Sequence, residues 1–218
     1  MNLEGPANNA RRLRTVVLRA AYYLFLAIGI VGLMYVGYLL ADARAYQERE
    51  QNAFEQPRVQ NVSRTEEPHP VGEDAVIGEM VIPRLGLKVI VVQGDSPSIL
   101  RRAVGHIFQT ALPGQPGNVA LTGHRDTFFR PLRNIRPGDA ITFKTLSGEF
   151  QYQVESTSVV PPSDVSVLDP SSGRTLTLIT CFPFYFVGAA PNRFVVRARQ
   201  VGPSTNPGHR QTAPASRD

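Results

Sequence analysis

Hydrophobic and polar positions divide the chain into one long apolar stretch, a polar linker and a series of short alternating segments. Residues 20–41, AAYYLFLAIGIVGLMYVGYLLA, contain no charged residue. A helix of this length spans about 33 Å, which matches the roughly 30 Å hydrocarbon core of a bilayer. The apolar part of a cleaved signal peptide is shorter, about 7–15 residues. The pattern therefore predicts a retained transmembrane helix over residues 20–41.

Arginines flank this segment unevenly, and their distribution predicts its orientation. Those beyond it, Arg44 and Arg49, are interleaved with acidic residues. An excess of lysine and arginine marks the cytoplasmic side, so we expect residues 1–19 to be cytoplasmic and the bulk of the chain to be extracytoplasmic. The arginines that precede the segment are Arg11, Arg12, Arg14 and Arg19.

Residues 42–74 are rich in Glu, Gln, Arg and Pro and hold too few apolar positions to bury a core. We predict that they form an extracytoplasmic stalk, helical near the membrane and irregular around its prolines. Residues 202–218 have a similar composition and are predicted to be a tail without a core.

Between residues 75 and 201, short apolar segments alternate with turn residues, and Ser147-Gly148 suits a two-residue hairpin turn. Seven or eight strands without a βαβ rhythm predict an all-β domain, either a closed barrel or a sandwich. The predicted strands are Val76–Ile82, Lys88–Gln93, Asn118–Thr122, Ile141–Lys144, Phe150–Glu155, Leu176–Cys181 and Phe194–Ala198, and the predicted short helices are Ser96–Val104 and Asp126–Ile135.

The formal net charge of +5 does not indicate a nucleic-acid partner. Its 23 basic residues are scattered along the chain without a basic run, and no zinc-finger, helix-turn-helix or RNA-binding signature is visible. A lipid bilayer with anionic headgroups fits this charge better than nucleic acid does.

Cys181 is the only cysteine of the chain and stands at the end of the string TLITC, before Phe182-Pro183-Phe184. A single thiol outside the cytoplasm cannot form an internal disulfide and is a liability unless it does chemistry. In cytosolic proteins a lone cysteine is more often a small buried residue on a strand. The predicted location therefore favours a reactive nucleophile.

A thiol needs a base or a cation to become a competent nucleophile, so the histidines are the next candidates. His69 and His209 fall in the polar linker and tail, and we expect both to be inert. His106 lies at a predicted helix-to-loop transition, where a structural and a supporting role are equally compatible. His124 leaves an apolar strand in the string LTGHRD, where polar residues gather beside a glycine, as they do in many sites.

Arg193 begins the last predicted strand, on the same face as Arg197 and Arg199. The latter two lie further along and are expected to face water. Arg193 instead stands at the end of the loop that leaves Cys181, so it can reach back toward the sulfur. A guanidinium offers a rigid fork of donors for a peptide carbonyl or a developing oxyanion.

These residues resemble the signature of the sortases, which are membrane-anchored cysteine transpeptidases. TLITC is followed after twelve positions by Arg193 and preceded by His124 in TGHRD, and GHRDTFFRPL, TCFPF and APNRFVV look most like class D. The resemblance covers most of residues 75–201 and also suits the N-terminal anchor. It implies a closed eight-stranded sortase-type β-barrel with short helices.

The resemblance also implies site roles, with Cys181 as the nucleophile, His124 as the catalytic histidine and Arg193 as the catalytic arginine. Thr180 would contribute to the oxyanion site, and His106 is a further candidate for oxyanion or substrate binding. No cofactor and no metal is implied. Two acidic residues near the predicted site loop, Asp164 and Asp169, supply too few oxygens for Ca²⁺, so calcium dependence is not expected.

As the resemblance implies, the enzyme would cut an LPxTG-like sorting motif between Thr and Gly. The acyl group would then pass from sulfur to an amine acceptor. The partners would be secreted proteins with a C-terminal sorting signal, an amine acceptor from a cell-wall precursor or a protein, and the lipid bilayer. The location implied is the bacterial plasma membrane, with a single span.

Three alternatives stay open from the sequence. A cysteine hydrolase of the papain type would share the acyl-enzyme step, although there the cysteine precedes the histidine in the chain. A tethered binding domain could keep the fold without catalysis. A metal site built from His106, His124, Asp126 and Cys181 would lack any close ligand pair of the CxxC or HExxH kind.

Overall fold

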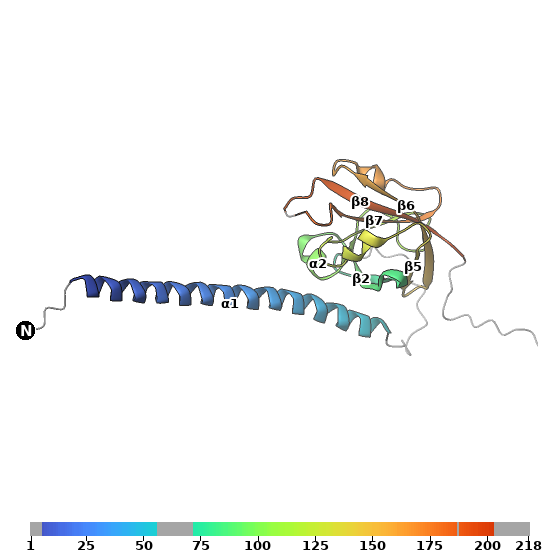
Figure 1. The fold of residues 1–218 in the computed structure, drawn as a ribbon. Coiled ribbons are helices and arrows are strands. Elements are labelled where there is room, and N and C mark those ends of the chain that lie inside the picture. Colours follow the sequence, from blue (N-terminus) through green and yellow to red (C-terminus); the bar gives the residue numbers. More distant parts are fainter. Residues whose placement is uncertain (1–5, 56–71, 187, 203–218) are drawn as a thin grey trace, which may run out of the picture. The chain divides into compact units, whose positions relative to one another are not determined.

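The structure is a computed structural model that describes residues 6–55, 72–186 and 188–202. Two compact units make up the chain, residues 1–45 and residues 46–218 (Figure 1). The second unit contains the β-barrel and, with it, all the residues predicted to carry chemistry. The predicted irregular part of the stalk, around Pro57, Pro68 and Pro70, and the predicted tail from residue 203 onward lie outside the described residues.

Helix α1 (Pro6–Glu55) contains the predicted transmembrane segment, residues 20–41. Among the described residues, one stretch, Arg14–Asn52, is long and apolar enough to cross a membrane, and its apolar side chains are exposed rather than packed in a core. The helix also continues to Glu55, into the first part of the predicted stalk. This arrangement is compatible with a single-pass anchor.

Eight strands close into a barrel in the order β1-β2-β3-β4-β7-β8-β6-β5. Pairing is antiparallel except between β2 and β3 and between β4 and β7, where it is parallel. Because the sheet closes on itself, the predicted barrel is confirmed and the alternative of a sandwich is excluded. The strands are β1 (Val76–Ile82), β2 (Leu87–Gln93), β3 (Val104–His106), β4 (Gly117–Thr122), β5 (Ala140–Thr145), β6 (Glu149–Val160), β7 (Arg174–Phe182) and β8 (Asn192–Gln200).

The core of the barrel is apolar because alternate residues of each strand point inward. On β7 the inward positions include Leu176 and Leu178, and on β8 they include Val196 and Ala198, all with no exposed surface. Large rings such as Phe143 fill the interior between the strands. Burial of these side chains supplies the main stabilisation of the domain and fixes which residues face outward.

Four short helical segments connect the strands: η1 (Pro83–Leu85), α2 (Pro97–Arg102), η2 (Arg130–Asn134) and η3 (Val165–Leu168). Two predictions are corrected here. The helix expected over Ser96–Val104 ends at Arg102, because the chain then pairs with β2 and β4 as strand β3. The helix expected over Asp126–Ile135 is reduced to the 3-10 turn η2.

An ion pair holds η2 against the β1–β2 connection. The Arg84 guanidinium donates to both carboxylate oxygens of Asp139 and to the Asn134 carbonyl. The hydrogen bond from Arg84 also lowers the pKa of Asp139 from its ordinary value, although partial burial of the carboxyl opposes this shift. The segment that leads from β4 to β5 is thereby fixed at its far end.

A substitution at Gly78 on β1 would test how tightly the barrel wall is packed. A Cβ atom there would lie 2.1 Å from the Lys144 carbonyl oxygen and 2.9 Å from Cε1 of Phe143. We expect Gly78→Ala to lower the free energy of unfolding by about 1–3 kcal/mol, since strand β5 would have to move. Thermal unfolding followed by circular dichroism measures this change. Gly173→Ala, whose Cβ would meet nothing within 4 Å, is the control, and equal effects of the two variants would refute the argument.

Candidate active site

The strand order places three predicted site residues at one end of three neighbouring strands. β7 pairs with β4 in parallel, with Thr122 opposite Ile179, and with β8 in antiparallel, with Cys181 opposite Arg193. His124 follows β4 by two residues, just as Cys181 lies two residues beyond Ile179. Segments that are far apart in sequence therefore end side by side.

A pocket of about 340 Å³ lies at this end of the barrel. Cys181, His124 and Arg193 all contribute to its wall, so the structure brings together three side chains predicted from three separate strings of the sequence. Their catalytic roles stay predictions. The complete lining is His124, Arg125, Asp126, Cys181, Gly188, Ala189, Ala190 and Arg193.

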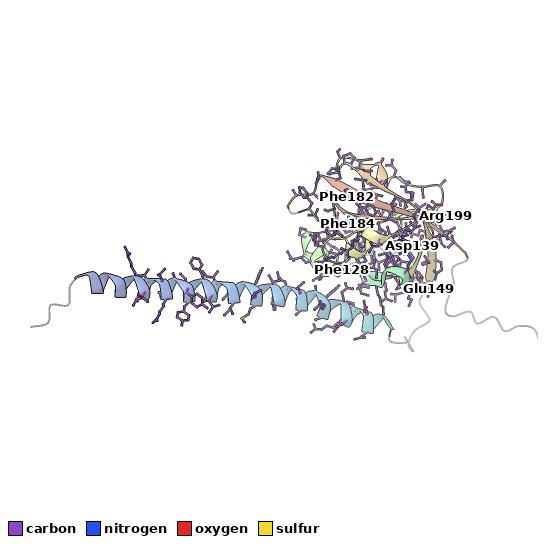
Figure 2. All side chains as sticks on the ribbon, in the orientation of Figure 1. Phe128, Asp139, Glu149, Phe182, Phe184 and Arg199 are labelled. Atoms are coloured by element: carbon purple, nitrogen blue, oxygen red, sulfur yellow. The ribbon has the colours of Figure 1, made fainter. Side chains whose placement is uncertain are left out.

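The Cys181 thiol is free and half-buried, so a reagent or substrate can approach it. Beyond it, the chain enters a cluster of three phenylalanines. Phe184 lies edge-on to Phe182 at 6.1 Å and to Phe194 at 5.3 Å between ring centroids, and Figure 2 labels the first two. This apolar contact fastens the end of β7 to β8 next to Cys181.

Thr180 does not point toward the pocket. Its side chain is buried, and its hydroxyl donates a 2.7 Å hydrogen bond to the Gly123 carbonyl. Successive side chains on a strand face opposite sides, so Thr180 faces away from the side on which Cys181 lies. The Thr180 hydroxyl therefore holds Gly123, the residue before His124, in place, and the expected contribution of Thr180 to the oxyanion site stays a prediction.

His106 also lies apart from the pocket. It is the last residue of β3, not part of a helix-to-loop transition, and only 2% of it is exposed. Its Nδ1 lies 2.9 Å from Oε1 of Gln93, and its Nε2 lies 2.9 Å from the Ala111 carbonyl and 3.0 Å from the Thr110 hydroxyl. His106 therefore braces the wall between β2 and β4, and its expected role in oxyanion or substrate binding stays a prediction that these contacts do not support.

Arg193 has a half-buried side chain whose hydrogen bonds among the described residues come from one nitrogen. Its Nη1 donates to the carbonyls of Ala190 at 3.3 Å and Asn192 at 3.1 Å. These bonds anchor the guanidinium at the end of the β7–β8 loop, and Arg193 lines the pocket. The group is positioned to donate to a carbonyl oxygen bound there.

Two functional residues escaped the sequence-based reasoning. Arg125, which directly follows His124, is buried and donates to the carbonyls of Pro183, Phe186 and Gly188 in the β7–β8 loop. The charged residue next to a candidate histidine in GHRD was the sequence signal that could have identified Arg125. Its partners could not be predicted, because they lie 58 to 63 positions away along the chain.

Asn118 is the second missed residue, and it fixes the loop on the other side of β7. Its amide nitrogen donates to the carbonyls of Val167 and Asp169, and its Oδ1 accepts hydrogen bonds from the hydroxyls of Thr177 and Thr175. The buried amide is thus fully satisfied, and it ties the segment that contains η3 to strands β4 and β7.

The electrostatic character of the pocket is mainly cationic. Arg125 and Arg193 line it, and Asp126, whose side chain is 73% exposed, is its single acidic residue. Among the described residues, no group of three or more His, Cys, Asp or Glu side chains could hold a metal ion. The alternative metal site also fails on geometry, because His106 does not line this pocket.

Comparisons with known proteins agree with these features. The family model described as the Sortase domain matches residues 80–201, more than half of the chain. The chain is 33% identical over 125 residues to Sortase D of Bacillus subtilis, covering 57% of this chain. It is 34% identical over 190 residues to Sortase SrtE1 of Streptomyces coelicolor, covering 77% of this chain. The matches span only 63% and 53% of these relatives' own lengths.

Solved structures give the same result for the fold. A Clostridium perfringens Sortase D5 transpeptidase aligns with a TM-score of 0.61 at 27% identity, covering 73% of this chain and 98% of that one. Sortase E1 of Streptomyces coelicolor, solved with a tripeptide in its active site, aligns with a TM-score of 0.53 at 34% identity, covering 59% and 90%. These comparisons agree with the resemblance to class D sortases. Class E sortases are similar to this chain to a comparable degree.

Because His106 is buried, we expect its protonation to change the stability of the fold with pH. Burial disfavours the imidazolium and lowers the pKa of His106 from 6.5, although the hydrogen bond with Ala111 partly opposes this. The unfolded chain binds the proton more readily, so this contribution to stability is complete above about pH 6.5 and is lost as the pH falls toward the folded-state pKa. The difference in Tm between the wild type and His106→Gln should therefore shrink on acidification. A difference that stays constant from about pH 8 to pH 5 would contradict this.

Proposed function

Because this chain belongs to the sortase family, whose members are cysteine transpeptidases, we propose that its barrel cleaves an LPxTG-like sorting motif and transfers the acyl group to an amine. One observation carries the proposal: the thiol of Cys181, the imidazole of His124 and the guanidinium of Arg193 line a single pocket. This combination supplies a nucleophile, a proton carrier and an oxyanion donor.

In the first half-reaction, His124 accepts the thiol proton and the Cys181 sulfur attacks the threonine carbonyl of the motif. The C–S bond forms, and the carbonyl oxygen becomes an oxyanion that the Arg193 guanidinium stabilises. The imidazolium then protonates the leaving glycine nitrogen as the amide bond breaks. The products are a thioester on Cys181 and a free amine.

In the second half-reaction, an amine enters and attacks the thioester carbonyl. His124 accepts a proton from the attacking nitrogen, and Arg193 again stabilises the oxyanion. The C–S bond breaks and a new amide forms, which regenerates the thiol when the proton returns to sulfur. Water in place of the amine would yield a carboxylic acid, so the hydrolase alternative differs only in this step.

The proposed location follows from α1. With Arg14–Asn52 as the candidate span and arginines concentrated before residue 20, the barrel would lie on the outer face of a bacterial plasma membrane. The proposed partners are secreted proteins with a C-terminal sorting signal and an amine on a cell-wall precursor or a protein. The hydrophobic length of α1 supports the bilayer as the third partner.

Removal of the nucleophile gives the first test. We expect Cys181→Ala to abolish the acyl-enzyme while leaving the barrel folded, because the half-buried thiol is replaced by a smaller side chain. The full chain in detergent micelles is incubated with LPxTG-type peptides, with and without a glycine-based amine. Mass spectrometry detects the thioester, and circular dichroism checks the fold.

In the wild type, added amine should convert the product from acid to amide. A thioester in Cys181→Ala would contradict the nucleophile assignment. A wild-type product that stays an acid at every amine concentration would favour the hydrolase. Full function after alkylation of Cys181 would favour the non-catalytic binding domain.

The role of Arg193 gives a second test. Arg193→Lys keeps the charge but loses the planar fork of donors, so we expect kcat/KM to fall by about 10²- to 10³-fold, as for loss of an oxyanion donor. Arg199→Lys is the matched control: Arg199 lies on the same strand but pairs with Glu155 and is 60% exposed. Near-wild-type kinetics for Arg193→Lys would refute the role.

A further inference from the structure

Arg125 directly follows His124 and lines the same pocket, yet only 7% of it is exposed. Burial of a guanidinium costs free energy unless hydrogen bonds satisfy its donors. The partners of this side chain therefore indicate what it does in the molecule.

The partners are three backbone carbonyls from one short stretch of the β7–β8 loop. Nη1 donates to the Pro183 carbonyl at 2.9 Å, and Nη2 donates to the Phe186 carbonyl and, at 3.2 Å, to the Gly188 carbonyl. Nε lies 3.6 Å from Oδ1 of Asp126. One planar group thus gathers acceptors from both ends of the loop segment 183–188, as the rigid geometry of arginine allows.

Other side-chain contacts also hold this segment. Phe184 packs against Phe182, Phe194 and the barrel core. The Tyr185 hydroxyl accepts a 3.1 Å hydrogen bond from Arg133, whose guanidinium also lies over the Tyr185 ring. Within the described part of the loop segment, one internal backbone hydrogen bond is present, from the Phe186 amide to the Pro183 carbonyl at 3.3 Å. The rings of Tyr185 and Phe186 are 79% and 44% exposed, so they bury little apolar surface. Among the described residues, Arg125 is the side chain that donates to the backbone carbonyls of this segment, so the path of its backbone depends on Arg125.

This loop is also part of the site. It begins after Cys181 and ends before Arg193, and its residues Gly188, Ala189 and Ala190 form one wall of the pocket. We propose that Arg125 is a positioning residue that holds the β7–β8 loop against the pocket and so sets how substrate is seated. This inference rests on the proposed function only in the experiment that measures enzyme turnover, and a separate experiment on the loop does not require activity.

The first experiment measures the loop without any assay of activity. Chymotrypsin cleaves after aromatic residues, and Tyr185 and Phe186 lie between the carbonyls that Arg125 holds. In the full chain in detergent micelles, cleavage after these residues should be about tenfold faster in Arg125→Gln than in the wild type, because local opening limits proteolysis. Mass spectrometry of the fragments identifies the cleaved bonds.

Two further variants sharpen this test. Arg125→Lys retains a charge but replaces the fork by a compact ammonium, so its cleavage rate should lie between those of the wild type and Arg125→Gln. Arg101→Gln removes an exposed arginine from α2 and should cleave at the wild-type rate. Equal cleavage rates in all four proteins would overturn the proposal.

The second experiment separates positioning from chemistry. Arg193 is paired with Cys181 across β7 and β8, and its shorter hydrogen bond goes to the Asn192 carbonyl on β8. The reacting groups should therefore largely keep their geometry when the loop loosens, even if the hydrogen bond from Arg193 to Ala190 in the loop weakens. We expect Arg125→Gln to raise KM for a sorting-motif peptide by about tenfold while kcat changes less than about threefold. A fall in kcat at unchanged KM would overturn the proposal, because it would place Arg125 in the chemical step.

The two experiments also separate this inference from the proposed function. If the wild type cleaves no sorting-motif peptide, the proposed function fails, and the proteolysis rates still decide whether Arg125 holds the loop. If the wild type is active and the variants show no change in KM or in loop cleavage, the inference about Arg125 fails alone.

Discussion

The pairing of β7 with β4 on one side and β8 on the other is the constraint on which the site depends. Each pairing fixes a register, so that Cys181 lies opposite Arg193 and the end of β4 delivers His124 to the same edge. A shift of one residue in either pairing would turn alternate side chains to the other face. The apolar interior, with Leu176 and Leu178 inside, makes that shift costly.

Buried polar side chains fix the positions of the loops relative to the strands. Asn118 ties the loop before β7 to the barrel, and Arg125 ties the loop after it. Both use their donors on backbone carbonyls, which have no partner in a sheet once the chain leaves the strand. Thr180 acts in the same way on Gly123. On each side of Cys181, one buried side chain thus donates at least two hydrogen bonds to backbone carbonyls of the neighbouring loop.

The barrel and the three pocket residues could be predicted from the sequence. Alternation of apolar and polar residues indicates strands, and the three pocket residues lie in short sequence motifs. Strand β3 could not, since it has three residues and exists only through its neighbours β2 and β4. The positions of Thr180 and His106 were also out of reach, because a polar residue beside a site can face either the pocket or the barrel wall. The loop contacts of Arg125 depend on tertiary structure that no local pattern encodes.

The two arginines of the pocket illustrate why geometry, and not residue type, separates their roles. Arg125 is almost completely buried, and both of its terminal nitrogens donate to loop carbonyls. Three of the five N–H donors of its guanidinium are therefore used on the loop. Arg193 is half-buried, and its two hydrogen bonds among the described residues use Nη1 alone. In the proposed mechanism, Arg193 would therefore donate to an oxyanion formed by attack of Cys181 without losing an existing contact, which is the condition for selective stabilisation of a transition state.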